Sequence, residues 1–510
     1  MNLETDVLIA GLGPVGAALA ALLGKWGVSA IAAEREKEVY RLPRAAHFDH
    51  EIMRLFQQLG IAAEIRDSVR VLPAYEFRNA SGEKLLRFDL TASRTPSGWA
   101  RSYTFHQPAM EIALRRRLAE FSQIKTLTGH TLTGISANDP NGVTVTVSAP
   151  DGREYSVRAR FLVGADGGAS LVRRLAGIEV FDYGFEESWI VVDTIVKDES
   201  GLPSYGLQIC DPARPTTVMP MSPGRRRWEF MLLPGESAEE MLADANIAKL
   251  LATQVRPNQA EVVRKAVYTF HGLVARRWRD GSILLAGDAA HQMPPFMGQG
   301  MCSGLRDAAN LAWKLALVCK EQTDPALLDT YQIEREPHVR FIIERAIEMG
   351  RIICTLDPNA ARIRDDQMIG RDSASPSAVP PDLPPISGGF VSTTAMAGTL
   401  FPQSHARLRD GRQGRLDDLM GHEFWLVSKG SIETESMPHL KVVQIGADLV
   451  DDGTVEEWLR RAGAEAALVR PDRYVYGTGA ARELLSSLRN LILKAPASDL
   501  AASRLKVAKP

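Results

Sequence analysis

Apolar and polar residues along the first part of the chain predict a strand, a turn, a helix and a second strand. The apolar run at 5–10 predicts a strand, the Ala- and Leu-rich stretch at 17–26 a helix, and 28–33 a second strand that ends at Glu34. The stretch 7–23 is apolar enough for a signal sequence or membrane span, but glycine and proline interrupt it and it lacks a basic leader. We therefore expect it to be buried in a β-α-β unit.

Farther along, strict alternation of apolar and polar residues predicts antiparallel strands. The alternation runs through 72–149 and again through 189–233, and it is clearest at 142–148. We expect these strands to form sheets between segments of the nucleotide-type fold. The segments 303–319 and 328–353 each predict one long helix.

A composition shift at 372–389 marks the clearest linker, because its prolines and serines cannot build a core. Beyond it, strands are expected at 424–427, 440–445 and 467–469, and a helix at 480–493. These elements predict a small α/β domain that contains no cysteine. The chain shows no internal repeat.

Composition places the chain among ordinary globular proteins. Of its 510 residues, 45% are hydrophobic and 24% are charged, and the formal net charge is -2. This length suits two or three domains, and the balanced charge favours neither nucleic acid nor an anionic membrane. The four cysteines form no CxxC pair and no metal-site spacing. We therefore expect a cytoplasmic protein with a small-molecule partner and no metal. The oligomeric state stays open, with a homodimer as one option.

Gly11, Gly13 and Gly16 form a GxGxxG turn between the first strand and the first helix. Glycine allows a tight turn, close approach of the backbone to a pyrophosphate, and tight packing of helix on strand. The helix amino end then faces the phosphates. Glu34, at the end of the second strand, is placed to accept both ribose hydroxyls of an adenosine. A chance glycine turn is the alternative, and the motif alone does not separate NAD from FAD.

Two further segments favour FAD. Residues 161–173 and 282–291 are each an apolar strand ending in a small-residue turn, with Asp166 or Asp288 at its tip. Both tips are expected beside the carboxyl edge of the first strand. The second turn reads GDAAH, which is typical of a contact with the flavin ribityl chain.

The three motifs together resemble those of the single-component flavoprotein aromatic hydroxylases. GxGxxG, GADGxxSxVR and GDAAH, followed by Pro294, Pro295 and the turn 298–301, form the pattern of this family. Within it, the chain is most similar to the 3-(3-hydroxyphenyl)propionate hydroxylases. That resemblance extends through 189–193, 210–215, 227–231 and 306–315. The residues after GDAAH, which border the ring pocket, depart from the phenylpropionate pattern, so the substrate stays open.

The resemblance implies an α/β fold in three parts. These are a Rossmann-like FAD-binding domain of the para-hydroxybenzoate hydroxylase type, an interleaved antiparallel substrate sheet, and a carboxy-terminal thioredoxin-like α/β domain without redox cysteines. The last domain would have a structural or dimer-contact role. The expected bounds are 1–72, 100–185 and 270–355 for the FAD-binding domain, 73–99 and 186–269 for the substrate domain, 356–393 for a linker, and 394–510 for the thioredoxin-like domain.

The resemblance also implies the reaction. NADH or NADPH would reduce FAD with the phenol bound, and O2 would then give a flavin hydroperoxide that hydroxylates the ring ortho or para to its hydroxyl. No second glycine-rich β-α-β unit follows the first, which argues against a separate nicotinamide domain. Two alternatives keep the scaffold: a polyketide or quinone-type hydroxylase, and a Baeyer–Villiger oxygenase. A third, of another class, is a catalytically silent FAD-binding scaffold or sensor.

Carried over motif by motif, the resemblance implies a set of FAD contacts. Asp288 would hold the ribityl chain, and the turn that opens the long helix would present backbone N–H groups to the flavin pyrimidine edge. Each assignment has a plainer alternative: a surface arginine for Arg44, a helix-start residue for Gln107, and a helix amino-cap for Asp288. The set is Gly11, Gly13, Pro14, Val15, Gly16, Glu34, Arg35, Arg44, Gln107, Asp166, Asp288, Pro295, Gly298, Gly300 and Met301.

A residue that hydrogen-bonds the phenol hydroxyl is expected near the ring, because a polarised phenol attacks better. Met219 and Phe230 would supply apolar walls, and Arg214 or Arg225 would take a substrate carboxylate. His291 is expected to be a packing residue without a proton-transfer role. Each substrate candidate is also explained by an ordinary place in a sheet or loop. The candidates for contact with the substrate hydroxyl or ring are His47, Asp49, Tyr205, Gln208, Tyr268 and Pro295.

Overall fold

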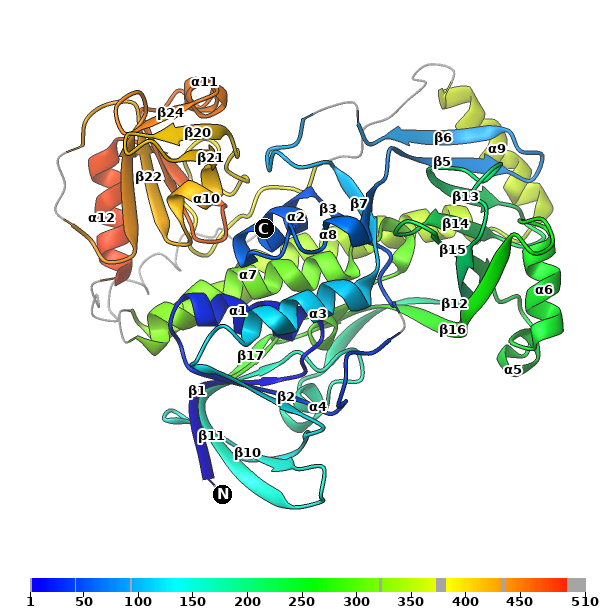
Figure 1. The fold of residues 1–510 in the computed structure, drawn as a ribbon, viewed down its shortest axis with the longest axis horizontal. Helices are drawn as coiled ribbons and strands as arrows, with labels where there is room; N and C mark the ends of the chain where they lie inside the picture. Colours follow the sequence, from blue (N-terminus) through cyan, green and yellow to red (C-terminus); the bar gives the residue numbers. More distant parts are fainter. Residues whose placement is uncertain are drawn as a thin grey trace, which may run out of the picture.

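The chain is an α/β protein of three parts, in a computed structural model that describes residues 2–41, 43–91, 94–320, 323–372, 382–432 and 436–492. Figure 1 shows a parallel sheet with its helices at the lower centre, a large mixed sheet on the right, and a small α/β unit at the upper left. The α/β class expected from the sequence is confirmed.

The first sheet is built on five parallel strands. α1 (Pro14–Lys25) leads from the first strand to the second, which confirms the β-α-β unit expected from the opening residues. It packs against α3 (Gln107–Leu118) and α7 (Gly300–Cys319), and its Ala and Gly residues are buried. The carboxyl ends of neighbouring strands meet at one edge, where ligands bind in sheets of this kind. The strand order is β18 (Ile283–Leu285), β11 (Glu154–Gly164), β1 (Asn2–Ala10), β2 (Ala30–Glu34) and β8 (Ile124–Thr128).

The alternating stretch at 142–148 is a strand as expected, but it joins the first sheet instead of forming a separate one. β10 (Gly142–Ser148) pairs antiparallel with β9 (Thr131–Asp139) and with the first half of β11. β11 has eleven residues, and β18 takes the same edge along its second half. One long strand thus carries both a parallel and an antiparallel neighbour on one side.

The second sheet has eight strands and is antiparallel except where β13 and β5 pair. Its two faces differ. Trp228 and Phe230 are buried in a core that includes residues of α6 (Asp244–Ala252), whereas Arg227 and Glu229, which alternate with them, line a cavity on the opposite face. The order is β19 (His291–Gln292), β16 (Ala260–Ala275), β12 (Val180–Val196), β15 (Arg225–Met231), β14 (Thr216–Pro220), β13 (Gly206–Cys210), β5 (Ala74–Asn79) and β6 (Lys84–Asp89).

Two long helices cross the centre of the molecule (Figure 1). α7 and α8 (Thr330–Ile353) confirm the helices expected at 303–319 and 328–353. A short sheet lies above them in the order β3 (His47–Asp49), β7 (Ser102–Phe105) and β4 (Val69–Val71), and α2 (His50–Leu59) follows directly from β3.

The interval 356–393, expected to be a linker, contains a helix. α9 (Pro358–Asp372) packs against β6, because Ala361 is buried and Met368 contacts the apolar cluster beneath the sheet. Arg364 also donates to the carbonyl of Cys210 at 2.7 Å. The Pro- and Ser-rich residues 373–381 lie outside the described residues, and Ile386 beyond them is buried.

The carboxy-terminal unit has thioredoxin-like connectivity. β22 and β23 are parallel, whereas β25 and β26 are antiparallel to their neighbours, and the strands and helix expected here are confirmed. The described residues between β22 and β23 form no helix, and Cys354 is the last cysteine of the chain, so no reactive cysteine pair is present. In sheet order the elements are β23 (Leu440–Gln444), β22 (Phe424–Ser428), β25 (Ala466–Val469) and β26 (Val475–Gly479), followed in the chain by α12 (Ala481–Ile492).

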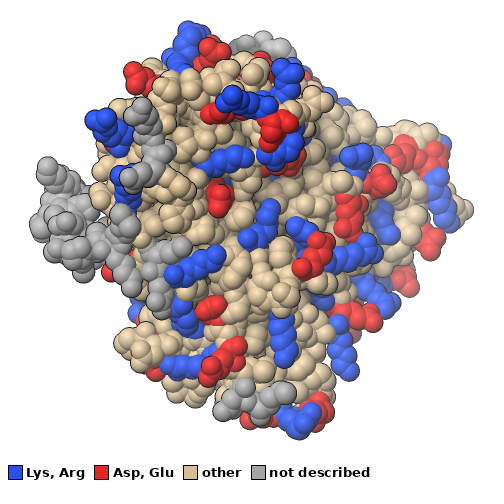
Figure 2. Space-filling model, turned by 60° about the vertical axis from the view of Figure 1, so that its left-hand side comes forward, with Lys and Arg blue, Asp and Glu red and all other residues tan. Residues whose placement is uncertain are grey.

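Charge on the surface is mixed. On the face shown in Figure 2, lysine and arginine side chains alternate with aspartate and glutamate, and neither sign dominates a large area. Across the described ranges, no helix has both the length and the apolar character needed to cross a membrane.

Candidate active site

A large cavity joins the carboxyl edge of the first sheet to one face of the second sheet. Its volume is about 1920 Å³, whereas a typical ligand pocket holds roughly 300–1,000 Å³, so more than one ligand fits. Every expected FAD contact except Gly16 lines it, and so do the substrate candidates His47, Asp49, Gln208, Tyr268 and Pro295.

The three glycines of the first turn have different roles. Gly11 has φ +99°, and a Cβ there would lie 2.4 Å from the carbonyl oxygen of Ala165. A Cβ at Gly16 would lie 2.0 Å from the carbonyl oxygen of Gly11. Neither Gly11 nor Gly16 therefore has room for a side chain. A Cβ at Gly13 would meet nothing within 4 Å, and Gly13 lines the cavity. In the described chain the N–H groups of Val15 and Gly16 donate to no backbone acceptor, so the turn can bind an anion.

Glu34 reaches this turn from the neighbouring strand. Its Oε2 accepts from the N–H of Leu12 at 2.8 Å, and its Oε1 accepts from the N–H of Glu36 at 3.0 Å. A carboxylate oxygen has a second acceptor position, so both can still take a ribose hydroxyl. Arg115, which the sequence did not indicate, also lines this region, and its buried Nε has no hydrogen-bond partner among the described residues. The sequence alone does not distinguish Arg115 from the two arginines that follow it, because basic residues are common at the carboxyl end of a helix.

Two carboxylates at the strand ends have acceptor positions left unused. Asp166 accepts from the N–H groups of Leu171 and Val172 with Oδ2, at 2.7 and 3.0 Å, while its buried Oδ1 has no partner in the part of the chain that the structure describes. Asp288 makes no hydrogen bond or ion pair with any described residue, and its side chain is open to the cavity. Burial by the cavity walls raises the pKa of Asp288. It caps no helix, so the amino-cap alternative is excluded.

A buried ion-pair network holds the GDAAH turn that carries Asp288. His291 Nε2 lies 2.6 Å from Oδ2 of Asp307, which also accepts from the N–H of Gly287 at 3.1 Å. Arg335 donates from Nε to the other oxygen of Asp307 at 3.0 Å. Burial alone would raise the pKa of Asp307, but His291 and Arg335 lower it below its ordinary value. His291, expected only to pack here, is therefore a positioning residue, and its partner is an acid 16 positions along the chain.

His47 holds the turn that opens α7. Burial lowers its pKa, so the ring is neutral, and Nδ1 donates to the carbonyl of Gly298 at 3.1 Å while Nε2 accepts from the Ser102 hydroxyl at 2.8 Å. Gly298 has φ +62°, and a Cβ there would lie 2.8 Å from His47 Nδ1. Both ring nitrogens are thus used within the protein. The N–H groups of Gly300 and Met301, in the first turn of α7, donate to no described acceptor.

Asp49 is also used by the protein. It caps α2 by accepting from the N–H groups of Glu51 and Ile52, and it pairs with Arg306 of α7. Burial would raise the pKa of Asp49, but Arg306 holds it well below its ordinary range. Arg306 also pairs with Glu51 at 2.6 Å, and Glu51 accepts from the hydroxyl of Tyr474 in the carboxy-terminal unit at 2.8 Å. Asp49 and His47 therefore shape the cavity wall and are not free to bind a ligand.

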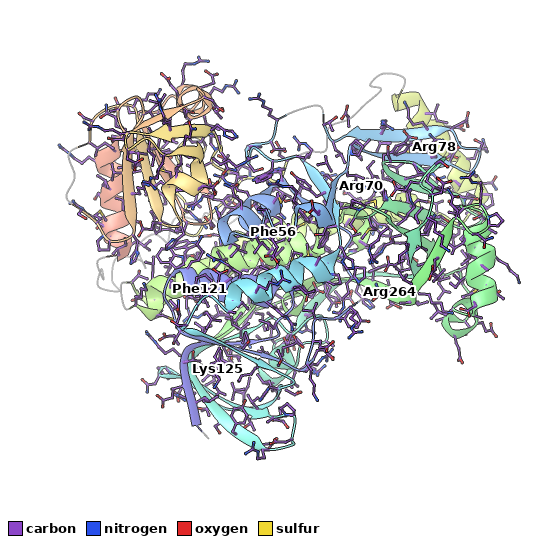
Figure 3. All side chains as sticks on the ribbon, in the orientation of Figure 1. Phe56, Arg70, Arg78, Phe121, Lys125 and Arg264 are labelled. Carbon is purple, nitrogen blue, oxygen red and sulfur yellow. The ribbon has the colours of Figure 1, made fainter. Side chains whose placement is uncertain are left out.

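The loop around Arg44 is clamped from two sides. Oε1 of Gln107 accepts from the N–H of Arg44 at 2.9 Å. Arg227 donates to the carbonyls of Pro43 and Arg44 at 2.8 and 2.7 Å and pairs with Asp193 at 2.7 Å. Arg264, labelled in Figure 3, adds a second pair to Asp193 from β16. The Arg44 guanidinium pairs with no described carboxylate and faces the cavity near Asp288.

One row of the second sheet forms the far wall of the cavity. Side by side across the strands lie Phe77, Gln208, Thr217, Glu229 and Val191, and all five line the cavity. Gln208 is tied to its neighbours: Nε2 donates to the Thr216 carbonyl at 3.1 Å and Oε1 accepts from the Thr217 hydroxyl at 2.6 Å. Tyr75, Tyr268 and Phe270 add aromatic surface. The face is therefore aromatic with a few polar groups.

Several residues expected near the substrate lie elsewhere. Tyr205 does not line the cavity: its hydroxyl accepts at 3.2 Å from Arg78 of β5, which is labelled in Figure 3 and does not line the cavity either. Arg214 pairs with Glu236, and neither it nor Arg225 lines the cavity. Phe230 faces the α6 side, while Met219 and Pro295 line the cavity as expected. Strand alternation shows which residues share a face, but not which face is hollow.

Comparison with known proteins identifies the family. Residues 4–346 match the family described as FAD binding domain, and 441–494 match the HcaD C-terminal domain. A probable NADH-specific resorcinol 4-hydroxylase of Rhodococcus jostii (strain RHA1) is 38% identical, with 96% of this chain and 97% of that protein covered. The chain belongs to the family of FAD-dependent aromatic hydroxylases.

Other members of the family match this hydroxylase over nearly its whole length. A 3-(3-hydroxy-phenyl)propionate/3-hydroxycinnamic acid hydroxylase of Comamonas testosteroni is 31% identical, with 96% of each chain covered. The crystal structure of aklavinone-11 hydroxylase with FAD and aklavinone superposes with a TM-score of 0.77 at 25% identity, covering 96% of this hydroxylase and 99% of that chain. The family expected from the three motifs is confirmed.

Proposed function

We propose that this hydroxylase adds one oxygen atom to a single phenolic ring, using FAD, NADH and O2. The observation that carries the proposal is one continuous cavity with two kinds of wall. Gly13, Asp288 and the start of α7 form one part, and the aromatic face of the second sheet forms the other. The relatives named for resorcinol and hydroxyphenylpropionate support a phenol as substrate.

The unused polar groups of the first part fit FAD. The open space at Gly13 and the free N–H groups behind it suit the pyrophosphate. Glu34 suits the adenosine ribose, and the unpaired carboxylate of Asp288 suits the ribityl hydroxyls. Arg44 supplies a positive charge on the same side. With these assignments, each of the named groups would contact a part of FAD.

FAD, when bound, supplies electron transfer from the nicotinamide and transfer of oxygen to the ring. The chain holds and shields the reactants. The free N–H groups of Gly300 and Met301, at the positive end of α7, would hold the flavin edge and stabilise negative charge there. Tyr75, Tyr268 and Phe270 pack against the substrate ring and exclude water. His47 and Arg306 keep the wall between these parts in place through their hydrogen bonds and ion pairs within the protein.

The test is NADH consumption by the FAD-loaded protein with and without a panel of phenols, with product mass as the second readout. A phenol of the right class speeds NADH consumption and gains one oxygen atom. Protein that cannot be loaded with FAD would contradict the assignment of the cavity. NADH consumption that no phenol stimulates, with no hydroxylated product, would favour a silent FAD-binding scaffold or sensor.

A multi-ring substrate is the second candidate. The structural similarity to aklavinone-11 hydroxylase supports it. Naphthols and anthraquinones in the same panel separate the two. A clear preference for them over monocyclic phenols would replace the single-ring proposal.

Three further expectations belong to the proposal. The preference for NADH over NADPH rests on the resorcinol relative, and steady-state rates with each nucleotide test it. A homodimer and a cytoplasmic location stay predictions, which light scattering and cell fractionation test. The bounds proposed for the FAD-binding domain, at 1–72, 100–185 and 270–355, are tested by limited proteolysis with and without FAD.

A further inference from the structure

Glu229 is the carboxyl group of the substrate wall that the protein leaves without a hydrogen bond. It lies on β15, and its side chain is 14% exposed, toward the cavity. Its nearest cation is Arg227, whose Nη1 is 3.7 Å from Oε1 of Glu229, too far for a hydrogen bond. No described residue donates a hydrogen bond to it. A mostly buried carboxyl group without a partner is costly unless a ligand supplies one.

The polar neighbour of Glu229 on the next strand is already engaged. The Thr217 hydroxyl, beside Glu229 on β14, donates to Gln208, and Tyr75 lines the cavity on the same wall. Gly206 makes room for this arrangement, because a Cβ there would lie 2.3 Å from the Tyr75 ring. The hydroxyl of Tyr268, on the same face, also has no described hydrogen-bond partner. The wall thus offers the Glu229 carboxyl group and the Tyr268 hydroxyl to a ligand.

The same wall offers no free positive charge to a substrate carboxylate. Arg227 is the only lysine or arginine among the residues described on the strands of the second sheet that lines the cavity. Its guanidinium is already engaged by Asp193 and by the carbonyls of Pro43 and Arg44. A carboxylate placed against this wall would lie near Glu229 without a cation of its own, which is unfavourable in a partly buried site.

Resting on the proposed function, we propose that Glu229 determines the substrate class. Its carboxyl group hydrogen-bonds a second ring hydroxyl, so the preferred substrate is a neutral polyhydric phenol and not a phenol that carries a carboxylate. Tyr268 is the second hydrogen-bonding group on the same wall. Burial raises the pKa of Glu229, which agrees with a carboxyl group that exchanges hydrogen bonds with a neutral partner.

The experiment compares resorcinol, phenol and 3-hydroxybenzoate with the FAD-loaded enzyme. Binding is measured from the change in flavin absorbance on titration, and turnover from NADH consumption and product mass. In the wild type, resorcinol binds most tightly and 3-hydroxybenzoate least. In Glu229→Leu the ratio of kcat/KM for resorcinol to that for phenol falls at least ~10-fold, since a site built to bind a hydroxyl depends strongly on that bond.

Glu348→Gln is the matched control, because Glu348 also lines the cavity but lies on α8, is 57% exposed and pairs with Arg345. It keeps the wild-type ratios. If Glu229→Leu fails to take up FAD, Glu229→Gln carries the test, because it keeps hydrogen bonding but removes the charge. It binds 3-hydroxybenzoate several-fold more tightly than the wild type does.

Unchanged ratios in the Glu229 variants, or a wild type that prefers 3-hydroxybenzoate to resorcinol, would overturn the inference. Failure of the proposed function is distinguishable from this. In that case no phenol is hydroxylated by any variant, whereas the flavin titrations still report which ligand the cavity prefers.

Discussion

Replacing Asp307 by Ala tests whether a buried charge network holds the turn that carries Asp288. Asp307 has three partners: His291 at 2.6 Å, the N–H of Gly287 at 3.1 Å and Nε of Arg335 at 3.0 Å. The side chains of Asp307 and His291 are fully buried, and that of Arg335 is 1% exposed. The variant therefore leaves a buried guanidinium whose only carboxylate partner among the described residues is gone.

The size of the loss follows from that unpaired charge. Removing one member of a buried ion pair costs about 3–5 kcal/mol, which is a large part of the stability of a typical domain. Because the network lies beneath Asp288, FAD affinity falls together with stability. In the double variant Asp307→Ala/Arg335→Met no buried guanidinium is left unpaired, so part of the lost stability returns.

The free energy of unfolding is measured by urea denaturation of the apoprotein, followed by tryptophan fluorescence. Trp278 lies 5.2 Å from the His291 ring and reports on this region. Asp410→Ala is the control, since its pair with Arg412 is solvent-exposed, and it costs less than about 1 kcal/mol. A loss below about 1 kcal/mol in Asp307→Ala, or a double variant no more stable than the single one, would refute the reasoning.

The remaining predictions concern the glycine turn, the ribityl carboxylate and acid stability. Gly13→Ala keeps the melting temperature of the apoprotein but weakens FAD binding. Gly16→Ala lowers the melting temperature, because its Cβ would lie 2.0 Å from a carbonyl oxygen. A lower melting temperature for Gly13→Ala than for Gly16→Ala would contradict this. Asp288→Ala weakens FAD binding ~10- to 100-fold, measured by fluorescence titration, and an unchanged affinity would exclude Asp288 as a contact. Burial would raise the pKa of Asp417, but Arg54 and Arg473 lower it to about 2. Its ordinary value in the unfolded chain is about 3.9, so it stabilises the fold above about pH 4 and this contribution disappears as the pH falls toward 2. Asp417→Asn shows a shallower loss of melting temperature over that range, and a parallel curve would count against it.

The order of the main elements could be predicted because the signals are local. The glycine turn, the two strands that flank it and the helices at 303–319 and 328–353 each depend on residues close together in the chain. α9 was missed because the Pro- and Ser-rich stretch after it dominates the composition of the region.

The substrate wall was harder to predict because it depends on strand register. Glu229 alternates with Trp228 and Phe230, and the sequence shows that they face opposite sides. It does not show that α6 covers the Trp228 side, which makes the Glu229 side the hollow one. Tyr205 was placed wrongly because it lies in the bend just before β13, where its hydroxyl accepts from Arg78. The pairing of His291 with Asp307 was also invisible, since it joins a turn to a helix that begins later in the chain.

The hydrogen bond from Tyr474 to Glu51 has a consequence for synthesis on the ribosome. The two residues are 423 positions apart, and elongation at roughly 5–20 residues per second separates their appearance by roughly 20–85 s. Throughout this delay the newly made amino-terminal half lacks the residue that completes one side of its ligand chamber. A product that ends before residue 474 therefore lacks this part of the cavity wall and leaves one oxygen of Glu51 without its hydrogen bond.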